Sequence, residues 1–261
     1  MNFNLIIGGV IIAFAVGLII MGYFWKPYDP NAMDSGAKMQ PPSFVHILGT
    51  DNFGRDIFSR ILQGAGTTLT IAAATVAIGV AGGLIIGGFT GYLGGVVDEV
   101  LMRVNDTITA FPSILMVLVI ISLTGPGKYN IIGALGILFI PSFARIVRAE
   151  FVRCRDMDYI KSARLMGVPV LRIMFVHILP NAGSVLLSSA AIGFNNAVLA
   201  EASMSFLGIG IQPPDASLGR MLAEAQTYFM GAPWYVLAVG ISIVLMILGF
   251  SLLGEGLDIE H

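Results

Sequence analysis

The sequence has little charge and a single cysteine. Of its 261 residues, 11% are charged and 56% are apolar. Because a soluble domain carries about 25% charged residues, this composition excludes an ordinary soluble enzyme and predicts a chain that crosses a membrane several times. The net charge of -2 provides no basic surface for a nucleic acid. Cys154 has no second cysteine for a disulfide bond, which fits a reducing compartment.

The sequence also lacks the residue patterns that catalysis or metal binding requires. The histidines His46, His177 and His261 are far apart, and no His, Cys and carboxylate residues have the spacing of a metal site. The pair Gly127-Lys128 lacks the upstream glycine of a phosphate-binding loop. Ionisable residues are scarce in the apolar runs, which argues against a proton relay. We therefore expect a chain that is not an enzyme, binds no metal or cofactor and does not itself hydrolyse ATP.

Long apolar runs dominate the sequence, and six of them reach the roughly 20 residues that a membrane-spanning helix needs. They predict an all-α, polytopic membrane protein with about six transmembrane helices in one domain, 1–261. Tyr23, Phe24 and Trp25 follow the first run like an interfacial aromatic belt, so we expect a retained span rather than a cleaved signal peptide. Pro141 interrupts the fourth run, which neighbouring helices can accommodate. The expected spans lie near 4–25, 67–93, 100–123, 130–149, 182–202 and 234–254.

Basic residues cluster around the connection between the fourth and fifth runs, 150–181. The cluster holds seven of the 14 Lys and Arg residues: Arg145, Arg148, Arg153, Arg155, Lys161, Arg164 and Arg172. By the positive-inside rule this connection is cytoplasmic, which places both termini inside and residues 26–66 and 203–233 outside. Four basic residues then lie outside, but the cytoplasmic cluster is denser.

Small residues recur every fourth position in the second run. They begin at Thr75 and continue as Gly79, Gly83, Gly87, Gly91 and Gly95. In lipid, this spacing lets two helix backbones approach closely. We expect a packing face that contacts another helix of the same chain or of a partner.

The cytoplasmic connection contains a stretch, 158–167, that favours a short amphipathic helix. Gly167 can end this helix. Tyr159, Ala163 and Met166 share one face at helical spacing, while Lys161 and Arg164 lie elsewhere on the turn. Such a helix could bind a soluble partner or lie on the lipid interface. The candidate contact residues are Tyr159, Lys161, Ala163, Arg164, Met166 and Gly167.

This stretch resembles the cytoplasmic loop of ABC-transporter permease subunits. The family pattern reads Glu-Ala-Ala, three residues, Gly, nine residues, Ile, one residue, Leu-Pro. Four positions match it: Ala163, Gly167, Leu179 and Pro180. Three positions depart from it: Lys161, Ser162 and His177.

Two outer segments resemble the subfamily for dipeptides, oligopeptides and nickel. They are "HILGTDNFGRDIFSRILQG", 46–64, and "EASMSFLGIGIQPPDASLGRML", 201–222. The motif residues of the first are Asp51, Gly54, Arg55, Asp56 and Arg60. Its charged members can form local ion pairs that shape a docking surface, each contributing about 0–1 kcal/mol if exposed. The second segment could gate the pathway, receive a binding protein or cap the bundle.

The resemblance implies a permease subunit in the cell (inner or plasma) membrane that imports di- or oligopeptides. Nickel or a metal chelate is the alternative solute. The implied partners are a homologous permease or a second copy, two cytoplasmic ATPases that carry ATP and Mg, an extracytoplasmic solute-binding protein and membrane lipid. A stand-alone secondary transporter or channel, and a membrane scaffold without transport, are the alternatives from other classes.

Polar residues in the fifth run indicate where a solute passes. An unpaired amide in hydrocarbon costs several kcal/mol, so Asn195 and Asn196 must face another helix or a wet pathway. Adjacent helical residues diverge by about 100°, so they cannot point the same way. The resemblance, in which the spans after the cytoplasmic loop approach the central axis, implies that at least one of them lines the pathway, and we assign Glu201, at the outer end of the run, to the pathway or its gate.

Overall fold

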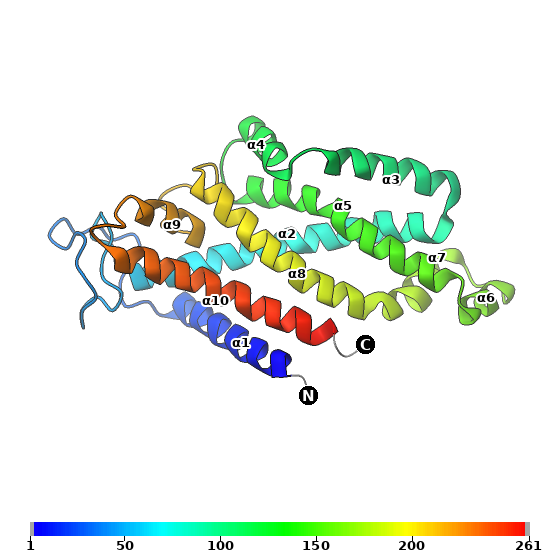
Figure 1. Ribbon diagram of the computed structural model, residues 1–261, viewed down its shortest axis with the longest axis horizontal. Helices are drawn as coiled ribbons and strands as arrows, with labels where there is room; N and C mark the ends of the chain where they lie inside the picture. The colour runs from blue at the N-terminus through cyan, green and yellow to red at the C-terminus, as the bar shows by residue number, and fades with distance from the viewer. Residues whose placement is uncertain (1–2, 259–261) are drawn as a thin grey trace.

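The computed structural model of the protein describes residues 3–258, so His261 lies outside the described part of the chain. The described residues fold into helices, and the β-type contact among them is an isolated bridge between Thr50 and Asp56. The elements are α1 (Phe3–Phe24), α2 (Ile57–Leu93), α3 (Gly95–Ala110), α4 (Ser113–Thr124), α5 (Lys128–Arg155), α6 (Asp158–Leu165), α7 (Val170–Arg172), the π-helix η1 (Ile173–Ile178), α8 (Leu179–Phe206), α9 (Leu218–Gln226) and α10 (Pro233–Asp258) (Figure 1).

The long helices run along the longest axis of the molecule (Figure 1). By length and composition α1, α2, α5, α10 and the continuous helix 170–206 can each cross a membrane. The pair α3 and α4, bent by 87°, is the sixth candidate. At about 1.5 Å per residue, the 37 residues of α2 exceed a hydrocarbon thickness of about 30 Å. The chain is a multi-pass membrane protein whose longest helices extend beyond the bilayer.

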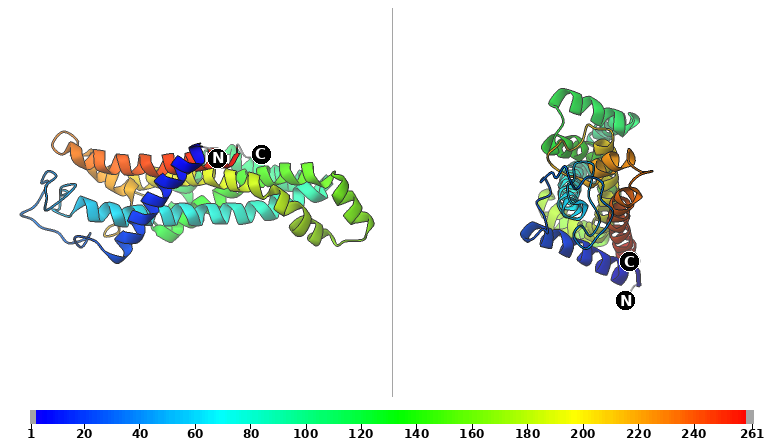
Figure 2. Two further views of the ribbon diagram at one scale, coloured as in Figure 1. Left: turned by 90° about the horizontal axis from the view of Figure 1, so that it is seen from below. Right: turned by 90° about the vertical axis from the view of Figure 1, so that its left-hand side faces the viewer.

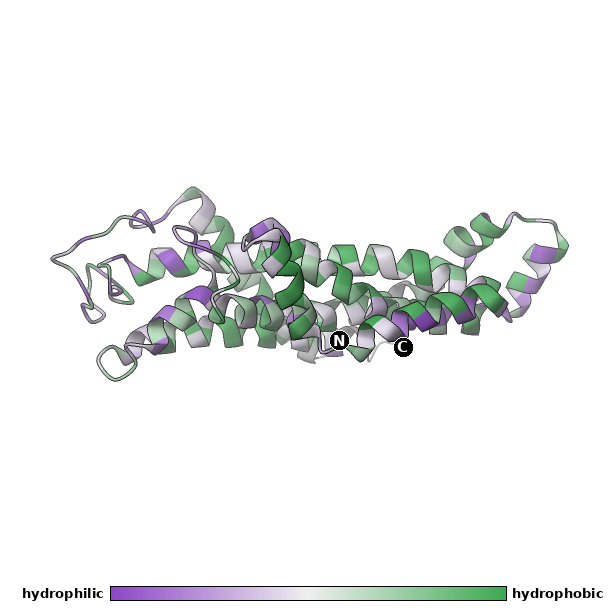
Figure 3. Ribbon diagram, turned by 90° about the horizontal axis from the view of Figure 1, so that it is seen from above, coloured by the Kyte–Doolittle hydropathy of each residue, from purple (hydrophilic) through white to green (hydrophobic). Residues whose placement is uncertain are grey.

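The two ends of the bundle differ. Segment 25–56 and α9 form one end, and α6 forms the other (Figures 1 and 2). Hydrophobic residues dominate the middle, and hydrophilic residues gather toward both ends (Figure 3). The start of α1 packs against the end of α10, where Gly8 approaches the backbone of Leu253. The start of α1 and the end of α10 therefore lie together on one side of the bundle.

Helix boundaries differ from the sequence-based spans in three places. α2 begins ten residues before 67, because the Asp56 side chain caps the helix by accepting from the Ser59 amide at 2.8 Å. The third predicted span is two helices, because Phe111 precedes Pro112 and takes an extended conformation. α5 continues to 155 and the next long helix starts at 170, so the connection predicted at 150–181 is shorter.

Glycines at four-residue intervals on α2 lie against α5. A Cβ atom on Gly79 would lie 2.8 Å from Cβ of Phe139, and one on Gly91 would lie 2.7 Å from Cβ of Phe151. The glycines between them, Gly83 and Gly87, meet α5 in the same way. These distances leave no space for side chains, so the glycines permit close approach of the two helices. Gly95 is a correction: it begins α3 with a φ of 57°, and a Cβ atom on it would meet nothing within 4 Å.

Candidate functional site

The end of α6 is fixed by backbone geometry at Gly167. The Gly167 amide donates to the Arg164 carbonyl at 3.0 Å, and the Val168 amide donates to the Ala163 carbonyl at 3.1 Å. This pair of bonds is a Schellman motif, and it places Gly167 at a φ of 75°, which a side chain would strain. A Cβ atom here would meet nothing within 4 Å, so the glycine is required for its conformation.

The two faces of α6 have different roles. Ile160 and Ala163 are buried in a core with residues of α5 and η1. Leu165 and Met166 point away from the bundle and are 90% and 76% exposed. This corrects the interpretation of Ala163 as a contact residue on the same face as Met166, because Ala163 is buried. Leu165 was not among the predicted contact residues, because the sequence does not show which face of the helix the bundle covers.

Side chains of α6 also hold it to other helices. Arg164 donates from Nε to the Tyr92 hydroxyl of α2 at 3.1 Å, and its guanidinium lies 4.8 Å from the ring centroid. Asn181, near the start of α8, donates to the Tyr159 hydroxyl at 3.1 Å. Partial burial raises the pKa of the Tyr159 phenol, so this acceptor stays neutral. Lys161 pairs with Asp158 at 3.1 Å in solvent. α6 is thus a tip with an exposed apolar end, connected to α2 and α8.

A groove runs between α5 and α8. One part is a cavity of about 340 Å³, which α4, α5 and α8 line and which we call the α4 cavity. Its wall is mainly apolar and carries four polar side chains: Ser113, Ser142, Ser189 and Asn196. A second cavity of about 600 Å³, which we call the inner cavity, lies closer to α6 and includes Glu150, Arg153 and Asn181.

The two cavities share one face of each helix. On α5 the lining positions 139, 142, 146, 150 and 153 recur at three- or four-residue intervals, as do 181, 185, 189, 192 and 196 on α8. Such intervals keep residues on one side of a helix. We call this surface, with both cavities, the α5–α8 groove.

The adjacent asparagines of α8 point to different surroundings. With its amide oriented to satisfy both atoms, Asn195 donates to the Ile247 carbonyl at 3.1 Å and accepts from the Ser251 amide at 3.2 Å, both on α10. Asn196 is exposed and lines the α4 cavity. The two side chains diverge, and Asn196 is the one that faces open space.

Glu201 lies away from the groove, in a buried polar cluster. Its carboxylate accepts from the Thr68 hydroxyl of α2 at 2.9 Å and from the Ser205 hydroxyl at 2.6 Å. Ser205 also accepts from Ser217, and the Leu218 amide donates to Thr68 at 3.2 Å. All four side chains other than leucine are fully buried. The assignment of Glu201 to the pathway lining is therefore corrected: it joins α2, α8 and the start of α9.

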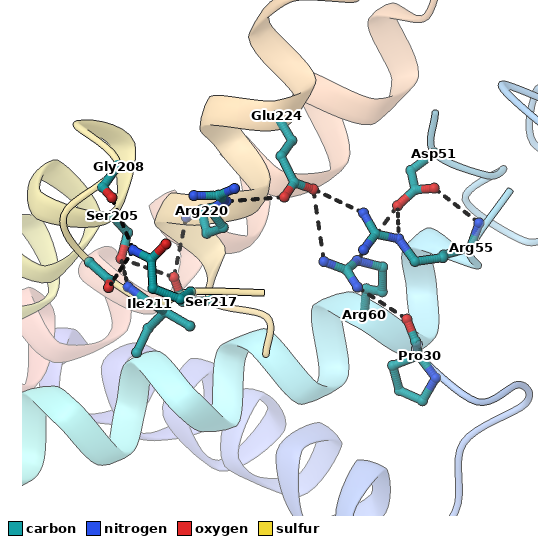
Figure 4. Close-up of polar contacts among 12 residues, drawn as sticks. Pro30, Asp51, Arg55, Arg60, Ser205, Gly208, Ile211, Ser217, Arg220 and Glu224 are labelled. Carbon is teal, nitrogen blue, oxygen red and sulfur yellow. Dashed lines mark hydrogen bonds and ion pairs between the residues drawn. The ribbon is translucent and has the colours of Figure 1, made fainter. Parts of the chain in front are cut away.

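A second polar cluster lies at the end of the bundle formed by segment 25–56 and α9, which we call the outer end after the orientation expected from the sequence (Figure 4). Arg55 donates from Nε to Asp51 at 2.6 Å and from Nη2 to Glu224 of α9 at 3.1 Å. Arg60 donates to the Pro30 carbonyl at 3.1 Å, and Arg220 reaches Glu224 at 3.1 Å. We call these residues the outer ion cluster; they join segment 25–56, α2 and α9.

The outer ion cluster corrects the expectation of exposed local pairs. Asp51, Arg55 and Arg60 are buried, and breaking a buried pair by removing one partner costs about 3–5 kcal/mol. Asp56 contacts His46 at 2.9 Å instead of an arginine, besides capping α2. Gly54 turns the chain tightly over Asp34 with a φ of 78°. The sequence offered no local signal for Glu224, which lies 169 residues beyond Arg55.

Residues 83–258 match the family described as binding-protein-dependent transport system inner membrane component. The chain belongs to this family.

Similar proteins cover nearly the whole chain. A dipeptide transport system permease protein of Haemophilus influenzae is 35% identical over 98% of this chain and 89% of its own length. A putative peptide transport system permease protein of Brucella suis is 40% identical over 96% of this chain and 84% of its own. A glutathione transport system permease protein of Pectobacterium atrosepticum is 36% identical over 95% and 83%. The fold matches a chain of the inward-facing MetNI methionine ABC transporter with a TM-score of 0.63 at 18% identity, over 75% of this chain and 93% of that one.

Proposed function

We propose that the chain is the permease subunit of an ATP-driven importer that receives small peptides from an extracytoplasmic binding protein. The observation that carries this proposal is the similarity along almost the entire chain to permeases named for peptides and glutathione. In this proposal ATP and Mg²⁺ bind to partner ATPases, and the chain itself catalyses no reaction.

The partners correspond to different surfaces. The exposed tip of α6, with Leu165 and Met166, receives an ATPase. A homologous permease or a second copy completes the pathway opposite the α5–α8 groove, and the outer end with α9 receives the binding protein. Membrane lipid covers exposed apolar side chains such as Val10 and Phe14 of α1.

The proposed orientation places α6 and both termini in the cytoplasm. It is tested with single cysteines in a Cys154→Ala background. An impermeant thiol reagent added to spheroplasts should label cysteines at Phe44 and Asp215, which are exposed at the outer end, and should leave one at Lys161 unlabelled. Labelling at 161 with protection at 44 and 215 would invert the orientation.

The function is tested by uptake in a host that lacks its own peptide importers. Co-expression of this chain with its sister permease, ATPases and binding protein should restore uptake of radiolabelled dialanine. Omission of the ATPases should abolish that uptake. Uptake of nickel without dialanine would favour the metal alternative, and dialanine uptake without the ATPases would favour a secondary transporter.

A further inference from the structure

We propose that Glu150 and Arg153 form, with Asn181, an exit subsite at the α6 end of the α5–α8 groove, where the charged termini of a peptide bind as it leaves the pathway. This inference rests on the proposed function as an importer of small peptides. It adds a specific binding site to that function.

The first argument is position. Glu150 lies one turn beyond Ile146, which lines the α4 cavity, and Arg153 lies one turn further. On α8, Asn181 follows the same face as Asn196. A solute that moves along the groove away from the outer end therefore meets this group of polar side chains before it reaches the cytoplasm.

The second argument is chemistry. The α4 cavity presents hydroxyls, one amide and apolar side chains, whereas the inner cavity presents an anion and a cation. A peptide with free termini carries both an ammonium and a carboxylate, and unpaired charges are costly against an apolar wall. Arg153 contacts the Oε2 atom of Glu150 through Nη2 at 2.6 Å and Nε at 3.1 Å. A guanidinium has five donors and a carboxylate about four acceptor sites, so each partner retains capacity for a peptide terminus.

The exposure of the pair suits transient binding. The Glu150 side chain is 15% exposed and that of Arg153 is 56% exposed. Arg153 can reach into the groove without a large desolvation cost, and a pathway requires binding that is weak enough for the solute to leave.

The third argument is the connection to α6. Asn181 donates to the Tyr159 hydroxyl of α6 at 3.1 Å, and Arg153 lies at the end of α5 five residues before Asp158. Any displacement of α6 by an ATPase therefore changes the relative positions of Asn181 and Arg153. The motion that opens the pathway would also release the peptide from the subsite.

The test uses the assembled importer in inside-out vesicles, with the reporter Ser184→Cys in a Cys154→Ala background. Ser184 lines the inner cavity and leaves the charged pair intact. Dialanine should slow maleimide labelling of the reporter several-fold, whereas N-acetyl-dialanine amide, which has no charged termini, should not. Glu150→Gln with Arg153→Gln should abolish this protection and lower the maximal rate of dialanine uptake several-fold. The KM for the loaded binding protein should stay unchanged, because docking occurs at the outer end.

The matched control is the exposed pair Glu99 and Arg103 on α3, whose contact is 2.8 Å. Glu99→Gln with Arg103→Gln should leave both the protection and the uptake rate unchanged. Three results would each overturn the subsite. They are equal protection by both peptides, no protection in a parent importer that transports dialanine, and a reporter that maleimide cannot reach because the sister subunit covers it. A parent that does not import dialanine would overturn the proposed function and the subsite with it.

Discussion

The outer end and the α6 end both concentrate charge, but they use it differently. At the outer end Asp51 and Arg60 are almost fully buried and belong to a network that spans three segments. At the α6 end Lys161 and Asp158 pair on one helical turn with side chains 59% and 98% exposed. Buried pairs fix geometry, whereas exposed pairs contribute little to stability. The outer end therefore holds a shape, and the α6 end presents a surface for contact.

The same comparison clarifies α9. Its start is bound to α2 through Thr68 and the Leu218 amide, and in its later turn Glu224 contacts Arg55, just before α2, and Arg60 of α2. A helix held at both ends by one neighbour moves with it. Of the interpretations considered for segment 203–233, a fixed cap over the bundle agrees best with these contacts.

The largest expected effect comes from opening the outer ion cluster. Arg55→Met removes the shortest ion pair of the buried Asp51 and one of the ion pairs of Glu224, which keep the longer contact with Arg60 and the contact with Arg220, respectively, so we expect a loss of about 3 kcal/mol in the free energy of unfolding. Lys161→Ala at the α6 end should change it by less than about 0.5 kcal/mol. Thermal unfolding of both variants in detergent measures the difference. Equal losses of unfolding free energy in the two variants would show that charged side chains contribute equally to stability at the two ends.

The next effect concerns contact rather than stability. Leu165→Asp places a carboxylate at the apolar tip of α6, where an ATPase would bury it without a partner. We expect ATPase affinity to fall by about 2 kcal/mol, roughly 30-fold, with no change in melting temperature. Co-purification of the ATPases with tagged permease measures it. Lys161→Ala is the control, and unchanged co-purification of Leu165→Asp would remove the tip from the interface.

A moderate effect is expected where the glycines of α2 pack against α5, between the two ends of the bundle. Gly83→Val adds a branched side chain where Phe143 and Ala144 of α5 already touch the glycine. Overpacking of this kind costs about 1–3 kcal/mol. Gly133→Ala on α5 is the matched control, because a Cβ atom there meets nothing within 4 Å. Similar melting temperatures for both variants would show that the glycines are not needed for close packing.

Local patterns in the sequence predicted the helices, the glycine face of α2 that packs against another helix, and the short helix α6. Hydrophobic runs and residue spacing lie within one segment of the chain, so the sequence shows them directly. Pairings between segments were not predicted. Arg55 with Glu224 and Thr68 with Glu201 join residues that are more than 130 positions apart. The inward direction of Ala163 also depends on which face of α6 the bundle covers, and the helix pattern alone does not decide that.

The last and smallest of these expected effects comes from substituting the adjacent asparagines of α8, Asn195 and Asn196. Asn195→Ala removes an interhelical bond to α10, and such bonds contribute about 0.6 kcal/mol in membrane proteins. Asn196→Ala removes an amide that faces the α4 cavity, so stability should not change. If a solute passes there, the loss of its hydrogen bond with the Asn196 amide should lower uptake about twofold to tenfold. Uptake of dialanine at equal protein level, together with the melting temperatures, separates these effects. Unchanged uptake with Asn196→Ala would mean that the pathway does not use this part of the α5–α8 groove, whereas reduced uptake with Asn195→Ala alone would move it toward α10.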